Sequence, residues 1–313
     1  MSKVPISLII DDGGVVNTFH FHDIGKKHEL LVPPAFAMLF GKICARYGVK
    51  GKFSIVPVPA GLGRLDEKDN VNMVPAGNIE AFVKYAKEYI QPRFSITPEL
   101  LTHFLAWNPV TRRNLHVCED AFVSSVSAEK IADYLVVGME ILCNLGLAPS
   151  GVSSPWKTGI DNEDNYARGI GMACKRALGL DRSFYFLHSR EDGFFRPKEM
   201  CNSSDTGRVI TIPNNTIDAF WGTMNPADTA QAIANARAGI DSLISEDGRS
   251  GRLRELYDAG EPMVMITHWQ SLYSDGRAIG LEGFEHLLQR IEKIFGNNVE
   301  WVNFEELSGI YCP

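Results

Sequence analysis

The 313-residue sequence lacks the features of secreted, membrane-bound or nucleic-acid-binding proteins. Its six cysteines have no CxxC or zinc-ribbon spacing, so we expect reduced thiols rather than a disulfide framework. No block of lysine or arginine occurs, and the formal net charge of −7 disfavours nucleic acid and anionic membranes as partners. The N-terminal stretch MSKVPISLIIDD has no signal-peptide hydrophobic region, and no apolar run approaches the ~18 residues of a membrane span. These absences predict a cytoplasmic protein.

Signatures of several enzyme classes are also missing. The sequence contains no P-loop, no G-x-S-x-G nucleophile elbow and no catalytic-cysteine signature. The segment GLGRLD at 61–66 lacks the third glycine of a dinucleotide fingerprint, and Pro57 and Pro59 interrupt the strand before it. No linker, low-complexity stretch or internal repeat divides the chain, which predicts a single domain over residues 1–313.

Short apolar segments alternate with amphipathic segments along the whole chain. Strands are predicted at 6–11, 52–58, 93–97, 150–154, 183–187, 208–212, 262–267 and 299–302. Helices are predicted near 33–47, 78–90, 127–145, 162–178, 226–245 and 281–295, with Ser127 as an N-cap. This alternation predicts an α/β fold, namely an irregular (β/α) barrel with seven to eight parallel strands. A doubly wound open sheet is the alternative.

The first predicted strand ends in two adjacent carboxylates, Asp11 and Asp12, followed by two glycines. Two ionised carboxylates this close repel each other and shift each other's pKa. A metal ion would neutralise one of them and acidify a bound water, while the other could take the proton of that water. The alternative is a pair of aspartates that only caps a helix or a loop.

Histidines, carboxylates and tryptophans follow the other predicted strands. They are His20, His22, His103, Trp156, Asp218, Trp221, His268 and Trp269. The chemistry of parallel α/β folds lies at the C-terminal ends of the strands, so we expect these side chains to gather at one mouth. The tryptophans there are predicted to bind substrate by stacking on the apolar faces of a sugar, with core packing as the alternative.

The segments LIIDDGG, GKFSIV, ELLTH, SSPW and VMITHWQ resemble, in order and strand position, the polysaccharide deacetylases (NodB-homology, carbohydrate esterase family 4). The resemblance extends from residue 6 to about 307. It implies an irregular (β/α) barrel that binds one divalent metal, with zinc expected and cobalt or nickel as alternatives. It also implies hydrolysis of the acetamide of N-acetylated sugars.

The resemblance also implies roles for individual residues. It places the general base on Asp11 and a metal ligand on Asp12. His268 falls on the histidine that protonates the departing amine. Asp218, after the sixth predicted strand, is our candidate for the carboxylate that orients His268 and raises its pKa.

Two motifs depart from the family pattern. The family's metal motif has two histidines four residues apart; His103 fits the first position, but Trp107 stands at the second. We expect His22 to supply the third ligand, because its loop follows Asp12, and His20 and His116 are the alternatives.

The second departure concerns the family's Arg-x-Pro-Tyr motif, which here reads Ser153-Ser154-Pro155-Trp156 and has no arginine. The orientation of Asp11 must therefore depend on other donors. Both departures predict a divergent member of the family, whose substrate need not be a polysaccharide.

The sequence thus predicts a metal-dependent deacetylase that acts on an N-acetylated sugar or a related amide. A glycoside hydrolase of the same barrel superfamily is one alternative, since such enzymes also use paired carboxylates. A carbohydrate-binding protein that has lost its metal and its activity is another. The expected partner is a carbohydrate or another small molecule, and the sequence leaves a homo-oligomer open.

Overall fold

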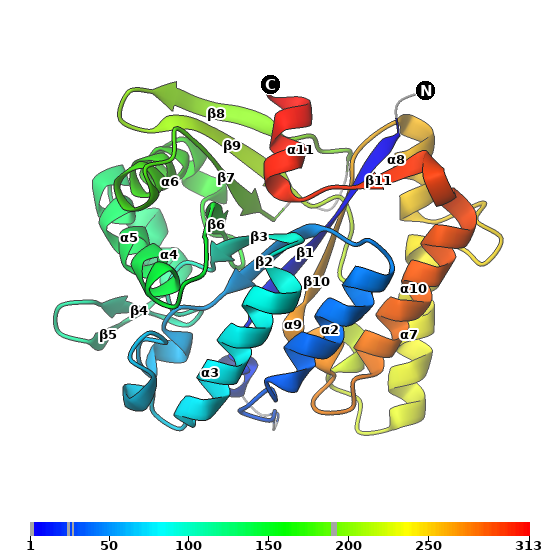
Figure 1. The fold of residues 1–313 in the computed structure, drawn as a ribbon, viewed down its shortest axis with the longest axis horizontal. Coiled ribbons are helices and arrows are strands. Elements are labelled where there is room, and N and C mark those ends of the chain that lie inside the picture. Colours follow the sequence, from blue (N-terminus) through cyan, green and yellow to red (C-terminus); the bar gives the residue numbers. More distant parts are fainter. Residues whose placement is uncertain (1–2, 24–25, 27, 189–192) are drawn as a thin grey trace.

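The computed structural model describes residues 3–23, 26, 28–188 and 193–313 as a mixed α/β fold (Figure 1). One sheet has the strand order β10-β1-β2-β3, with β11 beside the start of β1. Its strands are β1 (Val4–Gly13), β2 (Gly51–Ile55), β3 (Phe94–Pro98), β10 (Met263–His268) and β11 (Val299–Trp301). All of them pair in parallel, so their C-terminal ends lie at one end of the molecule.

A second sheet has the order β6-β7-β9-β8. Its strands are β6 (Gly151–Ser153), β7 (Arg182–Leu187), β8 (Lys198–Ser203) and β9 (Gly207–Pro213), and only β8 is antiparallel to its neighbour. Backbone bridges from Ile96 to Pro149 and from Glu99 to Ser153 join it to β3. On the other side, no strand pairing in the described ranges joins β9 to β10. The two sheets therefore form an open barrel.

Each of the eight strands predicted from the sequence coincides with a parallel strand of these sheets, which confirms the α/β fold. The predicted helices are also present, and the hydroxyl of Ser127 caps α5 by accepting a hydrogen bond from the Lys130 N–H. The helices are α1 (Phe19–His22), α2 (Ala35–Arg46), α3 (Ala76–Tyr85), α4 (Glu119–Ser125), α5 (Ala128–Asn144), α6 (Glu163–Leu178), α7 (Thr229–Leu243), α8 (Arg252–Ala259), α9 (Trp269–Tyr273), α10 (Ile279–Phe295) and α11 (Phe304–Tyr311). In Figure 1, α5 and α6 lie beside the second sheet, whereas α2, α3 and α10 flank the first.

Two antiparallel features were not predicted. One is β8, and the other is the hairpin of β4 (Leu105–Asn108) and β5 (Arg113–Cys118), which projects from the body of the molecule in Figure 1. Most of β5 is exposed, and Val110 in the hairpin turn is 89% exposed. A strand that packs against little needs no apolar run, so the hydrophobic pattern gave no signal for it.

Apolar side chains fill the space between the two sheets at one end, and polar side chains line it at the other. A small apolar cluster fills it and includes Phe304 and Leu307 of α11, which closes the end that carries both termini in Figure 1. Ile9 of β1 belongs to the same cluster. Because side chains of a strand alternate, Asp11 points to the same side as Ile9 and lies further toward the open end. The polar end of the barrel therefore begins at Asp11.

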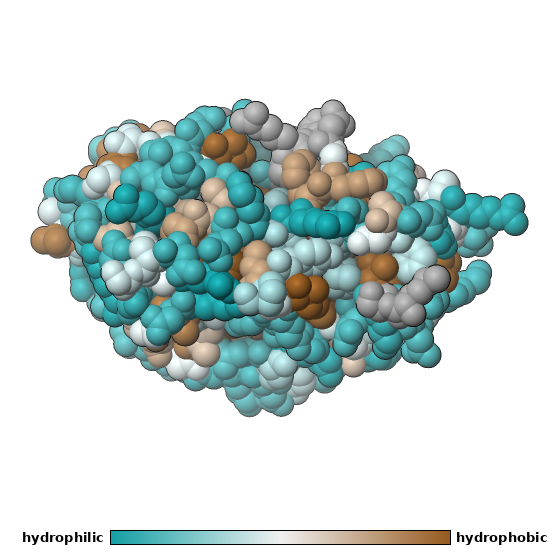
Figure 2. All heavy atoms as spheres, turned by 90° about the horizontal axis from the view of Figure 1, so that it is seen from above, coloured by the Kyte–Doolittle hydropathy of each residue, from teal (hydrophilic) through white to brown (hydrophobic). Residues whose placement is uncertain are grey.

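The end that carries the termini is seen in Figure 2, where hydrophobic residues are scattered singly or in small groups among hydrophilic ones. Such isolated apolar residues are normal for a protein surface. None of the helices in the described residues combines the length and the apolar character that crossing a bilayer requires.

Candidate metal-dependent active site

The two aspartates lie in an irregularity at the end of β1. The register between β1 and β2 shifts between Ile10 and Gly13, and Asp12 adopts the left-handed conformation with φ 61°. Gly13 is required here, because a Cβ on it would lie 2.2 Å from the carbonyl oxygen of Ser54. Asp11 and Asp12 are each 1% exposed. The irregular backbone gives the two carboxylates separate surroundings, so that each has partners of its own.

Asp12, Glu99 and His103 form a buried group, the acidic cluster, in which one ligand atom of each residue lies within 4.8 Å of the others. Oε2 of Glu99 accepts hydrogen bonds from the backbone N–H of Asp12 (2.7 Å) and the hydroxyl of Ser54 (2.6 Å). Nδ1 of His103 lies 2.7 Å from Oδ1 of Asp12, and its Nε2 lies 3.9 Å from Oε1 of Glu99. Despite the short contact with His103, neither carboxylate oxygen of Asp12 has a hydrogen bond of regular geometry.

The charges of the acidic cluster are strongly coupled. Burial and the carboxylates of Asp12 and Asp11 raise the pKa of Glu99 to about 8. Burial lowers the pKa of His103, but Asp12 and Glu99 outweigh it and raise that pKa to about 9. Burial raises the pKa of Asp12, yet His103 outweighs it and leaves that pKa below its ordinary value. Without a cation the cluster therefore retains protons at neutral pH, and a divalent cation would replace them.

The backbone around His103 is held by a fully buried carboxylate, that of Glu119. Its oxygens accept hydrogen bonds from the backbone N–H groups of Leu101, Thr102 and His103 (2.8–2.9 Å) and from the hydroxyl of Tyr134 (2.6 Å). His103 has φ 50°, a left-handed conformation that is uncommon for residues other than glycine. Strained backbone at a polar site persists only where its surroundings enforce it, and Glu119 supplies that restraint.

The residue that joins His103 in the acidic cluster stands four residues before it, and not four residues after it as the family motif implied. Trp107, at the expected second position, is buried on β4 and cannot be a ligand. Glu99 stands four residues before His103, at the end of β3, and takes part in the acidic cluster. Sequence reasoning missed Glu99, although the segment TPELLTH places a carboxylate at the motif's own spacing.

The three other histidines considered as ligands lie outside the acidic cluster. The ring of His22 lies 5.4 Å from that of His103, and its Nε2 is buried without a hydrogen-bond partner. Burial lowers the pKa of His22 to about 4, so its ring is neutral. His20 is exposed, with its Nδ1 2.8 Å from the carbonyl oxygen of His28, and His116 is exposed on β5. The ring of His22 thus lies beside that of His103, and its role as a third ligand stays a prediction.

Asp11 is held by a buried lysine that the sequence analysis overlooked. Nζ of Lys52, which is 0% exposed, forms an ion pair with Oδ1 of Asp11, and Ser153 donates a hydrogen bond to the same oxygen (2.8 Å). Nε2 of His188 lies 3.7 Å from Oδ2. Burial raises the pKa of Asp11, but Lys52, His188 and His268 outweigh it and lower that pKa. A lysine inside the otherwise apolar strand GKFSIV was the signal that the sequence offered.

His268 and Asp218 form the pair that the sequence predicted. Nδ1 of His268 lies 2.8 Å from Oδ2 of Asp218, which also accepts the hydroxyl of Ser271 (2.6 Å). Oδ1 of Asp218 accepts the Thr267 hydroxyl at 3.0 Å. Burial lowers the pKa of His268, but the hydrogen bond and charge of Asp218 outweigh it and raise that pKa to about 9. His268 is therefore an imidazolium at neutral pH.

The three tryptophans proposed for substrate binding have different positions. Trp156 stacks on the ring of His103 at 4.4 Å, and Trp221, which is 41% exposed, lies 4.8 Å from the ring of His268. Trp269 is 0% exposed, and its indole N–H donates a hydrogen bond to the carbonyl oxygen of Gly14. A ring buried in this way cannot stack on a substrate. Trp269 is a core residue, and its proposed role in binding is withdrawn.

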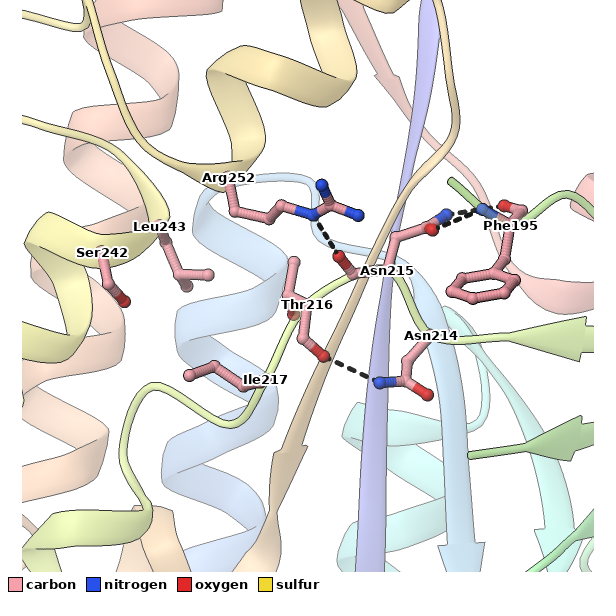
Figure 3. Close-up of a pocket in the computed structure, with 8 residues that line it drawn as sticks. All are labelled: Phe195, Asn214, Asn215, Thr216, Ile217, Ser242, Leu243 and Arg252. Carbon is pink, nitrogen blue, oxygen red and sulfur yellow. Dashed lines mark hydrogen bonds between the residues drawn. The ribbon is translucent and has the colours of Figure 1, made fainter. Parts of the chain in front are cut away.

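A separate cavity of about 230 Å³ lies where the chain leaves β9 and passes β10 (Figure 3). Its lining includes Asn215 and Arg252, and none of its residues belongs to the acidic cluster. The Arg252 Nε donates a hydrogen bond to the carbonyl oxygen of Asn215, whose side chain in turn pairs with the backbone of Phe195. These polar groups of the cavity are therefore engaged in hydrogen bonds within the fold.

The overall architecture places the protein among α/β folds of the deacetylase type. No family model and no curated protein matches the sequence. A Mycobacterium smegmatis protein assigned as a polysaccharide deacetylase has a TM-score of 0.55 and 13% identity, covering 99% of this chain and 91% of that one. The allantoinase Puue has a TM-score of 0.51 and 12% identity, covering 98% and 90%.

A GH57-type branching enzyme from the archaeon Pyrococcus horikoshii is also similar, with a TM-score of 0.51 and 12% identity. That match covers 100% of this chain and 71% of the enzyme. At such identities a structural similarity shows the fold alone. The predicted resemblance to polysaccharide deacetylases is therefore confirmed at the level of the fold.

Proposed function

We propose that the protein is a metal-dependent hydrolase that removes an acyl group, such as acetyl, from the nitrogen of an N-acylated sugar or a related amide. The observation that carries the proposal is the acidic cluster, together with an aspartate that pairs with a buried lysine and a histidine that pairs with an aspartate. Buried carboxylate oxygens without hydrogen bonds, as on Asp12, fit a cation site. Asp12, Glu99 and His103 would hold one divalent cation, with His22 as a further candidate ligand.

A divalent cation at this position would polarise the acyl oxygen and lower the pKa of a water molecule. Asp11 is suited to take the proton of that water. Lys52 and Ser153 hold its Oδ1, whereas its Oδ2 has no hydrogen-bond partner. The low pKa of Asp11 keeps the carboxylate ionised and able to accept a proton at neutral pH.

The departing amine needs a proton, because it leaves poorly as an anion. His268 holds one at neutral pH, and Asp218 keeps Nδ1 occupied so that Nε2 is the donor. The C–N bond breaks as the proton passes to nitrogen. Trp221 beside His268 and Trp156 beside His103 are proposed to bind the substrate.

The proposed activity is tested by incubating cation-loaded protein with N-acetylglucosamine, N-acetylated chito-oligosaccharides and small aliphatic and cyclic amides. We expect release of one carboxylic acid and one amine in equal amounts from at least one member of this set. New reducing ends without acid release would instead indicate a glycoside hydrolase. Ligand binding without turnover of any compound would indicate a non-catalytic carbohydrate-binding protein.

We predict that Lys52 positions Asp11 in place of the arginine that the motif at Ser153 lacks. Lys52→Met should lower kcat and destabilise the fold by ~3–5 kcal/mol, because it leaves the Asp11 charge buried without its partner. The double variant Lys52→Ser with Ser153→Lys exchanges the side chains of Lys52 and Ser153. It should restore much of the kcat and much of the stability, since the ammonium then approaches Asp11 from β6. Denaturant unfolding and steady-state kinetics measure the two effects.

The matched control for this prediction is the double variant Asp11→Asn with Lys52→Met. It removes both charges, so it should be more stable than Lys52→Met alone and yet inactive. A Lys52→Met protein with the kcat of the wild type would show that Lys52 is structural only.

We predict that Asp218 sets the alkaline limit of activity. His268 is protonated below its pKa of about 9, so the rate should fall as the pH rises through that value. Asp218→Asn removes the charge that raises this pKa, while burial still lowers it, so the alkaline limb should move ~2 or more pH units lower. The measurement is the pH profile of kcat/KM. His268→Gln should remove the limb, and an unmoved limb in Asp218→Asn would exclude His268 as the proton donor.

A further inference from the structure

We propose that Glu99 makes the cation site rich in carboxylate oxygen and thereby favours Mn²⁺. The ratio of its Mn²⁺ to its Zn²⁺ dissociation constant is then much lower than in a site with one carboxylate and two imidazoles. The inference rests on the cation site of the proposed function and adds the class of cation it prefers. The expectation of zinc came from a two-histidine motif, and the described residues supply Glu99 at the position of one of those histidines.

Glu99 is fixed by the protein itself. It is 1% exposed at the end of β3, where its neighbour across the two sheets is Ser153. The Asp12 N–H and the Ser54 hydroxyl both bind its Oε2, which leaves Oε1 on the side of Nε2 of His103. A cation would therefore meet a carboxylate that is already oriented, with little side-chain entropy left to lose.

The donor set is rich in oxygen. Asp12 and Glu99 contribute two negative charges and His103 one neutral imidazole, whereas the family motif would give one charge and two imidazoles. Carboxylate oxygens suit Mn²⁺ and Mg²⁺, and imidazole suits Zn²⁺. Oδ1 of Asp12 lies 2.7 Å from Nδ1 of His103, whereas its Oδ2 is buried without a hydrogen-bond partner and can serve as a donor atom for the cation.

Zinc binds most protein sites more tightly than manganese, so the informative quantity is the ratio of their dissociation constants. The experiment strips the full-length protein with a chelator and titrates it separately with Mn²⁺ and Zn²⁺ by calorimetry. Glu99→His, which restores the two-histidine spacing, should raise the ratio of the Mn²⁺ to the Zn²⁺ dissociation constant by ~10-fold or more. Glu99→Asp keeps the carboxylate and should leave the ratio within ~3-fold of the wild type.

Two outcomes would overturn the inference while leaving the proposed function in place. The first is a ratio that does not change in a folded Glu99→His protein, as judged by circular dichroism. The second is a Zn²⁺ affinity that falls as far in His22→Ala as in His103→Ala, because the site would then contain two imidazoles. Should Glu99→His not fold, an unchanged ratio in Glu99→Gln would equally overturn it. A wild-type protein that binds neither cation would remove the proposed function as well.

Discussion

Asp12→Ala protein should contain no bound divalent cation under conditions in which the wild type holds close to one equivalent. Asp12 provides one of the three ligand atoms of the acidic cluster, and its Oδ2 has no hydrogen-bond partner among the described residues. A site with three protein ligands and an open position cannot lose one of them and keep its affinity. Metal analysis of the purified, dialysed protein measures the occupancy, and calorimetric titration measures the remaining affinity.

A suitable control for this experiment is Asp133→Ala. Its carboxylate is 73% exposed and pairs with Arg176 on the surface, so its loss should change neither metal content nor stability by much. Wild-type occupancy in Asp12→Ala would show that Asp12 is not a ligand. The acidic cluster would then be only a hydrogen-bonded structural group.

Asp11→Asn should retain the cation and lose turnover by ~10²–10⁴, the usual contribution of a general base. The amide keeps the size of the carboxylate and its oxygen can still accept from Lys52 and Ser153, but it cannot take a proton from water. Metal analysis and single-turnover kinetics on any amide found to be a substrate provide the two readouts.

The comparison with Asp12→Asn separates the two roles. If Asp11→Asn loses the cation while Asp12→Asn keeps it, the roles of the two aspartates are reversed. If Asp11→Asn keeps both the cation and the wild-type rate, another group is the base. His188, whose Nε2 lies 3.7 Å from Asp11, would be the first to examine.

The eight parallel strands could be predicted because each is a short apolar run between turn signals, and burial on both faces leaves little room for polar residues. β8 and β5 were missed because they are largely exposed and carry no such run, whereas β4 is buried but only four residues long. Whether the barrel closes could not be predicted from the sequence either. No ladder of strand pairing joins β9 to β10 in the described residues; after β9, the N–H of Asn215 donates a hydrogen bond to the carbonyl oxygen of Val264 in β10.

The sequence by itself determined which residues could carry chemistry, because parallel strands bring Asp11, Asp12, His103 and His268 to one end of the sheets. It also placed Asp218 near His268, and their contact is present. The positions of these strands follow from the hydrophobic pattern, which is a local property of the sequence.

Only the tertiary structure decided which polar groups meet. Glu99, and not His22, forms the acidic cluster with Asp12 and His103, Lys52 is the buried cation that pairs with Asp11, and Trp269 lies in the core and not at the mouth. Each outcome depends on side-chain direction at a strand end: the left-handed backbone of Asp12, the face of β2 that carries Lys52, and the start of α9 at Trp269. A shift of one residue along a strand moves each side chain from one face of a sheet to the other. The sequence does not reveal these directions, because packing between distant segments sets them.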